Sequence, residues 1–316
     1  MGHKESYFVT GAAGFIGACL VRRLLADKKD VSILLKAGSK PWRLSGVLGR
    51  VRVFKGDLTD TGAVSRAVKK ARPTVIYHLA AHGAYPFQKD AEKIIKTNVL
   101  GTWNLLRTCG EFDYRVFVNT GSSSEYGAKS TAMRETDLLE PNSYYAVAKS
   151  AQTLLCQHVA RSQKRPIVTF RLFSVYGPFE EPTRLVPTLI RSCLKGRDLS
   201  MVSPQTARDF IFVEDVVDAY LRLGSLSKLS GDIINIGTGR QQRLKEAVSL
   251  VKTLTQSEVK VKWGAMPGRI WDTDKWVGNV EKSHRLIGWK AQTPFREGLK
   301  KTIAWYKQNK NLWTLR

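Results

Sequence analysis

Short apolar runs alternate with longer stretches of helical periodicity through the first half of the chain. The apolar runs predict strands over residues 7–10, 31–35, 51–54, 74–79, 115–119 and 167–172. Between them, apolar residues recur at helical spacing and predict helices over residues 16–26, 60–71, 91–109 and 144–161. Runs such as Val75-Ile76-Tyr77 lack polar alternation, which indicates strands covered on both faces. The pattern therefore predicts a doubly wound parallel α/β sheet.

This pattern changes after Phe173. Prolines interrupt the next segment, and the remainder mixes short helices and strands. Residues 210–220 again have the character of a strand followed by a helix. We expect residues 1–173 and about 209–236 to form the sheet domain. A smaller, interleaved α/β cap that binds substrate is then expected from residues 174–208 and 237–316.

The composition is that of a globular protein. Of the 316 residues, 43% are hydrophobic and 25% are charged. No apolar run is long enough to span a bilayer and no signal peptide is visible, so we expect a cytoplasmic protein without a membrane partner. The cysteines, at positions 19, 109, 156 and 193, are far apart and form no Cys-x-x-Cys pair. This spacing argues against a disulfide framework and a zinc site, and no other metal site is expected.

The net charge is strongly positive. Lysine and arginine number 51 against 27 aspartate and glutamate residues, which gives a formal charge of +24. Such a field attracts anionic ligands, among them dinucleotides, sugar nucleotides and nucleic acids. The basic residues are spread along the chain without a basic arm, a zinc finger or an RNA-recognition motif, so we expect no nucleic-acid partner. A cofactor-sensing protein that uses its charge to bind nucleic acid or an acidic partner is the alternative from another functional class.

A glycine-rich turn joins the first predicted strand to the first predicted helix. It reads Thr10-Gly11-Ala12-Ala13-Gly14-Phe15-Ile16-Gly17. Between a strand and a helix, such glycines allow a tight turn, let a pyrophosphate approach the backbone and let helix and strand pack closely. The helix N-terminus then offers unpaired N–H groups to the phosphates. The turn predicts a Rossmann-type dinucleotide site, and the simpler alternative is a tight turn without a ligand.

The end of the second predicted strand bears on the choice of dinucleotide. Enzymes that prefer NAD usually carry an acidic residue there, but no acid occurs over residues 31–55. Lys36, with Arg43 nearby, offers a cation to a 2′-phosphate, so NADP(H) is favoured and NAD(H) stays open. After the third strand, Asp57 either accepts from the adenine amino group or caps the helix that follows.

Tyr145 and Lys149 lie four residues apart at the start of a predicted helix, and therefore on one face of it. A lysine cation beside a phenol stabilises the phenolate and lowers its pKa. Upstream, the serine-rich residues 121–127 follow a buried strand at the edge of the sheet where α/β proteins bind ligands. Tyr-x-x-x-Lys alone is a common accident. Together with the glycine turn and the serines, in this order, it indicates a catalytic Ser/Tyr/Lys set, which a pure sensor would not need.

With these motifs, nearly the whole chain resembles the extended short-chain dehydrogenase/reductase family, in particular its nucleotide-sugar epimerase, dehydratase and ketoreductase branch. The phosphate turn and the Tyr-x-x-x-Lys pair are similar to those of the family. Further similar segments are His-Leu-Ala-Ala at residues 78–81, the segments 171–178 and 208–216, and Asn-Ile-Gly-Thr-Gly at residues 235–239. The resemblance implies a Rossmann-type fold and a sugar-nucleotide substrate.

By position, the resemblance also implies roles for individual residues. Tyr145 is the acid/base, Lys149 binds the nicotinamide ribose and tunes Tyr145, and Ser122 hydrogen-bonds the reacting oxygen. Arg208 and Arg269 hold the substrate diphosphate, since guanidinium groups bind phosphate bidentately. The other residues expected at the substrate are Ser123, Ser124, Ser174 and, at the nucleotide ribose, Asp272, while Ser124 also shares the role of Ser122. The residues expected at the cofactor, besides the catalytic pair, are Gly11, Gly14, Phe15, Ile16, Gly17, Lys36, Arg43, Asp57, Leu58, Leu79, Ala80 and Ala81.

The chain departs from the family where 4,6-dehydratases of the main type place an Asp-Glu pair after the catalytic hydroxyl. Those positions are Ser123 and Ser124 here, and serine can neither protonate a leaving hydroxyl nor remove a carbon-bound proton. Glu125 is one residue displaced, so a shifted alignment would restore an acid. The serine-rich segment is instead similar to that of 4-keto-6-deoxy sugar-nucleotide reductases.

We therefore favour an NADPH-dependent reductase of a 4-keto(-6-deoxy) sugar nucleotide. A nucleotide-sugar 4-epimerase with retained NAD uses the same residues and is the alternative, and a 4,6-dehydratase is disfavoured. Members of the family often pair through their long helices. The resemblance thus implies a homodimer with a four-helix interface built from residues 91–109 and 144–161.

Overall fold

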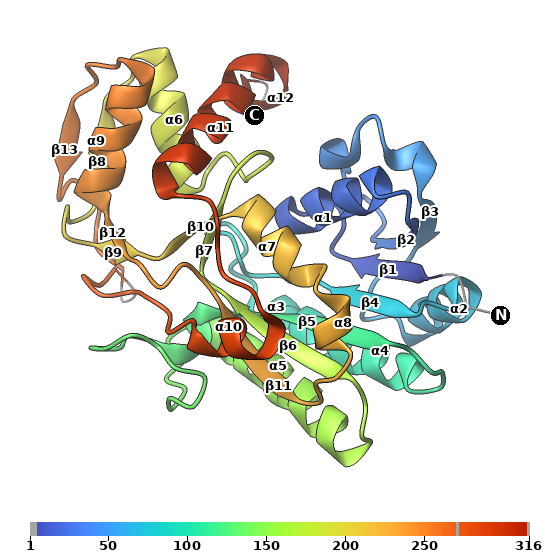
Figure 1. Cartoon of the computed structure of the whole chain (residues 1–316). Coiled ribbons are helices and arrows are strands. Elements are labelled where there is room, and N and C mark those ends of the chain that lie inside the picture. The colour runs from blue at the N-terminus through green and yellow to red at the C-terminus, as the bar shows by residue number, and fades with distance from the viewer. Residues whose placement is uncertain (1–4, 270–271, 315–316) are drawn as a thin grey trace.

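Parallel strands form the centre of the molecule. The computed structural model describes residues 5–269 and 272–314, and its central seven-stranded sheet has the order β11-β6-β5-β4-β1-β2-β3 (Figure 1). Its strands are β1 Ser6–Thr10, β2 Asp30–Leu35, β3 Arg52–Lys55, β4 Val75–His78, β5 Val116–Ser122, β6 Ile167–Leu172 and β11 Asp232–Ile236. β1 pairs in parallel with both β2 and β4, so the sheet extends from β1 in two directions. The doubly wound α/β sheet predicted from the sequence is confirmed.

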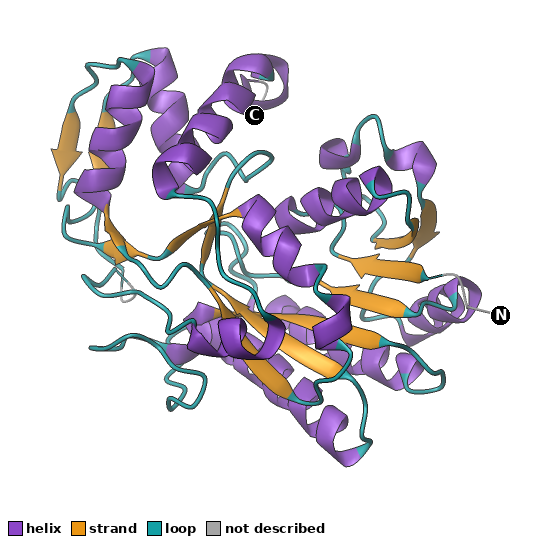
Figure 2. Cartoon of the chain, viewed as in Figure 1, coloured by secondary structure: helices purple, strands orange, loops and turns teal. Residues whose placement is uncertain are grey.

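Helices cover both faces of this sheet (Figure 2). One face carries α1 Phe15–Ala26, α7 Val213–Tyr220, α8 Leu223–Leu226 and α10 Glu281–Ile287, and the other carries α2 Thr61–Ala71, α3 Ala91–Ile95, α4 Gly101–Cys109 and α5 Tyr144–Ser162. Successive strand residues point to opposite cores. Tyr7 and Val9 of β1 pack with α1, whereas Phe8 between them packs with α2. Because both faces are buried, the strands need the continuous apolar runs seen in the sequence.

The long helix expected over residues 91–109 is not continuous. The segment η3, Lys96–Leu100, has π-helical hydrogen bonding and separates α3 from α4. Within it, the Asn98 side chain donates to the carbonyl of His82 and accepts from the His82 N–H, both at 2.8 Å. The widened turn thus lets a buried amide anchor the loop that follows β4, a use typical of π-bulges.

A second, smaller core forms the cap. Its strands pair as β7 Ser174–Tyr176 with β10 Phe210–Phe212, β8 Leu199–Met201 with β13 Val261–Trp263, and β9 Ala207–Arg208 with β12 Gln242–Arg243. The helices are α6 Leu185–Lys195, α9 Leu244–Thr255, α11 Phe295–Gln308 and α12 Lys310–Thr314. Apolar residues of α6, α9 and α11 share one core cluster. The segments that build the cap therefore come from both sides of β11 in the sequence.

The carboxyl ends of the parallel strands meet at the edge of the sheet that faces the cap (Figure 1). The phosphate turn follows β1, Lys36 follows β2, Asp57 comes shortly after β3, and Ser122 ends β5. Open α/β sheets bind their ligands at this edge. Among the described residues, no helix is both long and apolar enough to cross a membrane.

Candidate active site

The phosphate turn needs its glycines. Gly11 has a φ of +70°, and a Cβ placed on it would lie 2.5 Å from the backbone nitrogen of Ala80. A Cβ on Gly17 would lie 2.3 Å from the carbonyl oxygen of Gly11. Gly14 stands at the N-cap of α1, where it has no side chain to occupy the first N–H groups of the helix. The turn therefore fits a pyrophosphate, which those N–H groups can bind.

The end of β4 lies directly against this turn. Leu79 and Ala80 contact Gly11, and the Ala80 N–H donates to the Thr10 hydroxyl at 3.3 Å. Phe15 and Ile16 begin α1, where Phe15 is buried and the partly buried Ile16 packs on the core. The structure thus brings together the glycine turn and two of the residues after β4 that the sequence assigned to one cofactor site, Leu79 and Ala80, and Ala81 follows them in the chain.

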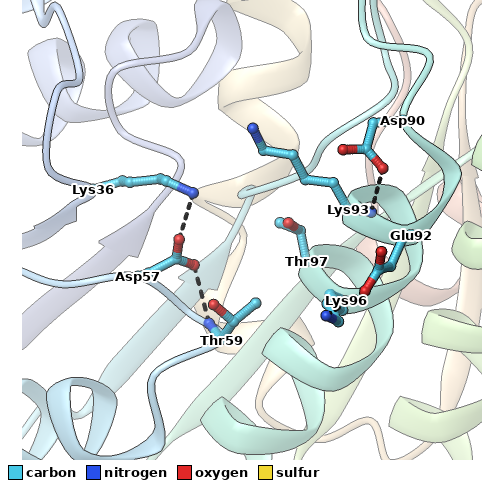
Figure 3. Close-up of a pocket in the computed structure, with 8 residues that line it drawn as sticks. All are labelled: Lys36, Asp57, Thr59, Asp90, Glu92, Lys93, Lys96 and Thr97. Carbon is cyan, nitrogen blue, oxygen red and sulfur yellow. Dashed lines mark hydrogen bonds and ion pairs between the residues drawn. The ribbon is translucent and has the colours of Figure 1, made fainter.

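Lys36 and Asp57 meet across a shallow groove (Figure 3). They form an ion pair, and Asp57 also accepts from the Thr59 N–H at 3.0 Å. Burial raises the pKa of Asp57, but the hydrogen bonds from Lys36 and Thr59 outweigh burial and hold the pKa below its usual value. The expectation that Asp57 caps the following helix is wrong. α2 begins at Thr61, and its N-cap is Asp60, which accepts from the Ala63 N–H at 2.9 Å.

Arg43 and Leu58 are directed into the protein. The buried Arg43 guanidinium donates to the Phe179 carbonyl at 2.7 Å and pairs with Glu181 at 3.0 Å. Its remaining nitrogen lies 3.5 Å from the Ala13 carbonyl of the phosphate turn. Arg43 therefore ties this turn to the segment that leads into α6. Leu58 packs its side chain in the core beneath α2.

Ser143 places Tyr145 and Lys149 at the start of α5. Its hydroxyl accepts from the Ala146 N–H at 3.2 Å, so it acts as the N-cap of the helix. Lys149 is buried, and its ammonium group donates to the Thr120 carbonyl at 2.5 Å and to Gln152 at 2.8 Å. Burial lowers the pKa of Lys149 to about 8. Burial likewise raises the pKa of Tyr145 to about 12, and a hydrogen bond with Ser122 opposes this rise.

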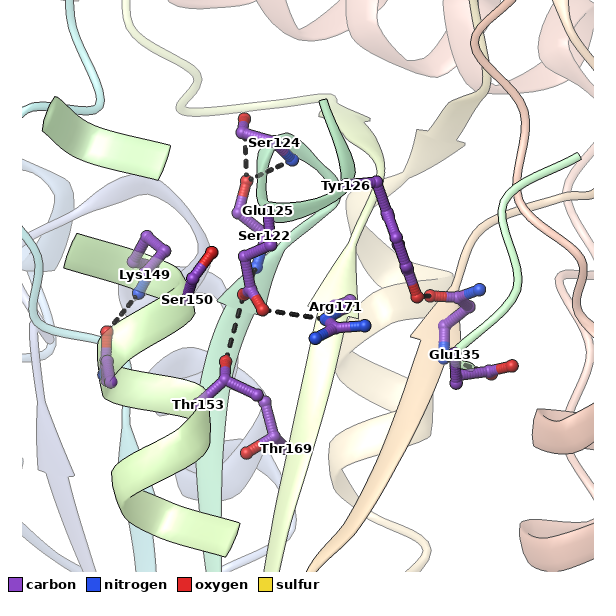
Figure 4. Close-up of polar contacts among 12 residues, drawn as sticks. Ser122, Ser124, Glu125, Tyr126, Glu135, Lys149, Ser150, Thr153, Thr169 and Arg171 are labelled. Carbon is purple, nitrogen blue, oxygen red and sulfur yellow. Dashed lines mark hydrogen bonds and ion pairs between the residues drawn. The ribbon is translucent and has the colours of Figure 1, made fainter. Parts of the chain in front are cut away.

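Ser122 and Ser124 lie together at the end of β5, and dashed lines in Figure 4 join them. The Ser122 hydroxyl donates to the Ser124 hydroxyl at 3.0 Å and accepts from the Ser124 N–H at 3.1 Å. The buried Ser123 hydroxyl instead accepts from the indole N–H of Trp276 at 3.1 Å. Ser122 and Ser124 are thus linked hydroxyls beside Tyr145, while Ser123 fastens a segment of the cap.

Glu125 lies on the core side of this turn (Figure 4). It is fully buried, and its carboxylate pairs with Arg171 at 2.8 Å. The same carboxylate accepts from the Thr153 hydroxyl at 3.0 Å and from the Ser122 N–H at 2.7 Å. Because protein donors hold both of its oxygens, Glu125 is not placed to give or take a proton from a substrate. The acid that a shifted alignment would provide is therefore committed elsewhere.

Arg208, Arg269 and Asp272 come together on the cap. Asp272 pairs with Arg208 at 2.8 Å and accepts from the Arg269 N–H at 3.0 Å. The Arg208 guanidinium also lies over the Trp276 ring, 5.4 Å from its centroid. Both Asp272 oxygens thus have protein partners, so in this structure Asp272 orients Arg208.

Asp209 is a further residue of the site, and it was not among the residues predicted from the sequence. This fully buried carboxylate accepts from the Thr238 N–H and hydroxyl at 2.8 and 2.6 Å, and from the N–H groups of Gly239 and Gly278 at 3.1 and 3.2 Å. Its own carbonyl accepts from the Ser174 N–H at 2.9 Å. Asp209 therefore joins the turn after β11 to two cap segments beside Arg208. The sequence signal that could have identified Asp209 is an acidic residue directly before the apolar run Phe210-Ile211-Phe212.

Two further side chains support the site, and only one of them, Gln152, could have been predicted from the sequence. Gln152 lies three residues after Lys149 on α5, a spacing that makes helical neighbours, and could have been found. Trp276 reaches the serine turn from far along the chain and has no local signal.

Comparisons with known proteins agree with this geometry. Residues 7–237 match the family described as the NAD dependent epimerase/dehydratase family. The chain is 28% identical to the human dTDP-D-glucose 4,6-dehydratase over 333 residues, which cover 99% of this chain and 93% of that protein. The structure of the Thermotoga maritima UDP-glucose 4-epimerase with UDP-glucose matches with a TM-score of 0.88 at 25% identity, over 98% of this chain and 100% of the other. MoeE5 in complex with UDP-glucose and NAD matches with a TM-score of 0.84 at 31% identity, over 96% and 99% of the two chains.

The family match spans the phosphate turn, the serine turn and the Tyr-x-x-x-Lys helix. The solved relatives extend the similarity to the cap. The chain therefore belongs to the NAD dependent epimerase/dehydratase family, and it is an enzyme.

Proposed function

We propose that the protein is an NADPH-dependent reductase of a 4-keto sugar nucleotide. The observation that carries the proposal is which residues occupy the two positions where dehydratases have catalytic acids. Ser123 and Ser124 occupy them, and the neighbouring Glu125 is buried against Arg171. What is left beside Tyr145 is a pair of hydroxyls, which suits proton delivery to an oxygen and not removal of a carbon-bound proton.

In this reaction, a bound nicotinamide dinucleotide supplies the hydride that reaches the keto carbon. Tyr145 gives its phenolic proton to the oxygen on which negative charge develops. Ser122 donates a hydrogen bond to the same oxygen and so holds it beside Tyr145. Lys149 stabilises the negative charge of the resulting phenolate, and its proposed second role is to bind the cofactor ribose. Ser124 supports Ser122 when their hydroxyl pair reverses, so that Ser124 donates to Ser122 and the single Ser122 proton is free for the substrate oxygen.

The substrate diphosphate is assigned to Arg208 and Arg269, with Ser174 on the sugar side. Arg208 is preoriented by Asp272 and Trp276, which reduces the entropy lost when it binds an anion. Relatives of this fold bind UDP-glucose, which supports a sugar nucleotide. The formal charge of +24 steers such an anion towards the protein. The free cysteines suit a reducing compartment, and we assign the protein to the cytoplasm.

The direct test compares two reactions of the wild-type chain. Incubation with NADPH and the 4-keto-6-deoxy sugars linked to UDP, dTDP, CDP or GDP should consume NADPH and give a C4 alcohol, followed by absorbance and mass spectrometry. Incubation with UDP-glucose without reductant should give no C4 epimer. NADPH oxidation that requires no keto sugar, or epimer formation without reductant, would contradict the proposal.

A 4-epimerase with retained NAD is the second candidate. The observation in its favour is the similarity of the whole chain to a UDP-glucose 4-epimerase and to a protein solved with NAD. Tyr145 would first accept the C4 hydroxyl proton and later return it to the same oxygen, after the 4-keto sugar has turned in the pocket so that hydride returns to the opposite face of C4. NAD released from freshly denatured protein would put this candidate first.

Lys36 carries the proposed preference for NADP(H). The Lys36→Ala variant should weaken NADPH binding by about tenfold or more, because a charge-assisted hydrogen bond contributes about 1.5–3 kcal/mol. NADH binding should change little, since NADH lacks the 2′-phosphate. Isothermal titration of the stripped protein with each dinucleotide measures both constants. Lys70→Ala, which removes the same charge at the far end of α2, is the matched control.

Equal losses for NADPH and NADH in Lys36→Ala would show that Lys36 acts on the shared part of the dinucleotide. Equal affinities in the wild type would likewise remove the basis for an NADP(H) preference.

We further propose a homodimer through α4 and α5. Large apolar side chains are exposed along these helices, among them Trp103, Val147 and Leu154. Val147 and Leu154 lie seven residues apart and therefore on one face of α5. Leu154→Glu should convert a dimer into a monomer of 35.4 kDa, as measured by light scattering. Leu138→Glu, at a loop residue that is 76% exposed, should leave the mass unchanged, and a monomeric wild type would refute the interface.

A further inference from the structure

We infer that Glu125 is a positioning residue for the reaction. From the core side of β5, its carboxylate fixes the turn that presents Ser122 and supplies the negative charge that keeps Lys149 cationic. The inference rests on the roles proposed for Ser122, Tyr145 and Lys149. This role differs from proton transfer to or from a substrate, which acids at positions 123 and 124 would carry out in a dehydratase.

The hydrogen bonds of Glu125 show how the turn is fixed. Its carboxylate accepts from the Ser122 N–H at 2.7 Å, while the Ser122 hydroxyl accepts from the Ser124 N–H at 3.1 Å. This reciprocal arrangement is a capping box, here on the 3-10 turn η4, Ser123–Tyr126. It sets the residue at which β5 ends and thus the direction of the Ser122 hydroxyl. A Cβ on Gly121 would lie 2.6 Å from the Glu125 carboxylate, so any side chain at position 121 would displace that carboxylate.

The ion pair with Arg171 is poorly suited to a purely stabilising role. The buried Nη1 atom of Arg171 has no hydrogen-bond partner, although the guanidinium lies over the Tyr126 ring at 4.6 Å. Replacing a buried ion pair by apolar residues is often neutral or stabilising. The Glu125–Arg171 pair lies directly behind the turn that presents Ser122 and leaves one buried nitrogen without a partner. The Glu125 charge therefore has a function other than stabilising the fold.

The group on which the Glu125 charge acts is Lys149. Its ammonium group is buried, and the oxygens that accept from it, on Thr120 and Gln152, carry no formal charge. Glu125 accepts from Thr153, which lies four residues after Lys149 on the same face of α5, so the carboxylate reaches the helix one turn from Lys149. Burial raises the pKa of Glu125 itself, and Arg171 opposes that rise. Glu125 is in turn the main group that opposes the effect of burial on the pKa of Lys149.

Several ionisable groups on the surrounding elements interact with the catalytic pair. Those that act on Lys149 or Tyr145, or on which Lys149 acts, are Glu125, Tyr85, Cys156, His78 and Arg184, whereas Arg171 acts on Glu125.

Loss of the Glu125 charge moves both catalytic groups in the same direction. The carboxylate raises the pKa of Lys149 and also raises the pKa of Tyr145. Without it, each group loses its proton at lower pH. Reduction needs a cationic Lys149 and a protonated Tyr145, so the alkaline limb of kcat/KM should shift to lower pH.

The test uses the full-length protein with Glu125→Gln and with the double variant Glu125→Gln/Arg171→Gln. The double variant leaves no buried unpaired charge and guards against a failure to fold. Thr153→Val removes one hydrogen bond from Glu125 without removing charge and is the control. We expect kcat to fall at least tenfold with little change in KM. The alkaline limb should move down by about one pH unit in both Glu125 variants and stay in place in Thr153→Val.

A titration of the Lys149 side chain separates this inference from the proposed reaction. NMR of protein labelled with ¹³C at the lysine ε-carbon, assigned with Lys149→Met, follows the Lys149 pKa without substrate. A lower Lys149 pKa in both Glu125 variants supports the inference whether the wild type reduces or epimerises. An unchanged Lys149 pKa in the folded variants overturns it, even if the wild type proves to be a reductase.

Discussion

Tyr145→Phe is expected to lower kcat by about 10²- to 10⁴-fold, the range that a positioned acid/base contributes. The variant removes one hydroxyl from a ring that lies at the start of α5, so the fold and the phosphate turn stay intact. Dinucleotide affinity should therefore change far less than kcat, because the substitution keeps the aromatic ring and removes only the hydroxyl that acts in the transition state. Steady-state kinetics and dinucleotide titration, run on the same preparation, measure the two effects.

The chain offers a close control for this experiment. Tyr144 is the preceding residue of the same helix, and it is 65% exposed. Tyr144→Phe should keep wild-type kcat. If Tyr145→Phe retained more than roughly a tenth of wild-type activity, neither reduction nor epimerisation through Tyr145 could stand.

The second large effect is expected on stability. Asp209→Ala should lower the free energy of unfolding by about 3 kcal/mol or more, because hydrogen bonds to a charged group contribute about 1.5–3 kcal/mol each and the buried Gly278 N–H would lose its partner. The donors concerned belong to Thr238, Gly239 and Gly278. Urea denaturation followed by tryptophan fluorescence measures the loss. Asp209→Asn should fall between the wild type and the alanine variant, since an amide keeps one accepting oxygen.

Asp218→Ala is the control for Asp209. Asp218 makes an ion pair with Arg23 in which both side chains are largely exposed. Such pairs contribute about 0–1 kcal/mol, so this variant should unfold close to the wild type. A similarly small change for Asp209→Ala would mean that the cap segments are held by their apolar contacts alone.

The parts of the fold that could be predicted are those set by local pattern. The apolar run from Tyr7 to Val9 was sufficient to predict a strand buried on both faces, because successive residues of a strand face opposite cores. The glycine turn and the Tyr145–Lys149 spacing were equally readable, since a tight turn and one helical turn are local geometry.

The parts that could not be predicted depend on contacts between distant residues. Nothing near Glu125 in the sequence shows that Arg171 lies behind it. The sequence alone therefore could not decide whether Glu125 is a displaced catalytic acid or one half of a buried ion pair. The resemblance assigned Asp272 to a ribose, and its ion pair with Arg208 spans too large a separation in sequence to have been predicted. The π-bulge at Asn98 was hidden for a different reason, because its apolar periodicity is that of an ordinary helix.

The interleaving of the cap with the sheet has a consequence for biosynthesis. α6 and β8 leave the ribosome before α9, β13 and α11, the elements that cover and pair with them. The apolar side of α6, with Val186, Leu189 and Ile190, therefore stays uncovered while the rest of the chain is translated. The sheet is also open at β6 until β11 arrives. A nascent chain of this protein thus carries two unfinished surfaces at once, and chaperones have the longest access to it during synthesis of the segment between β8 and α11.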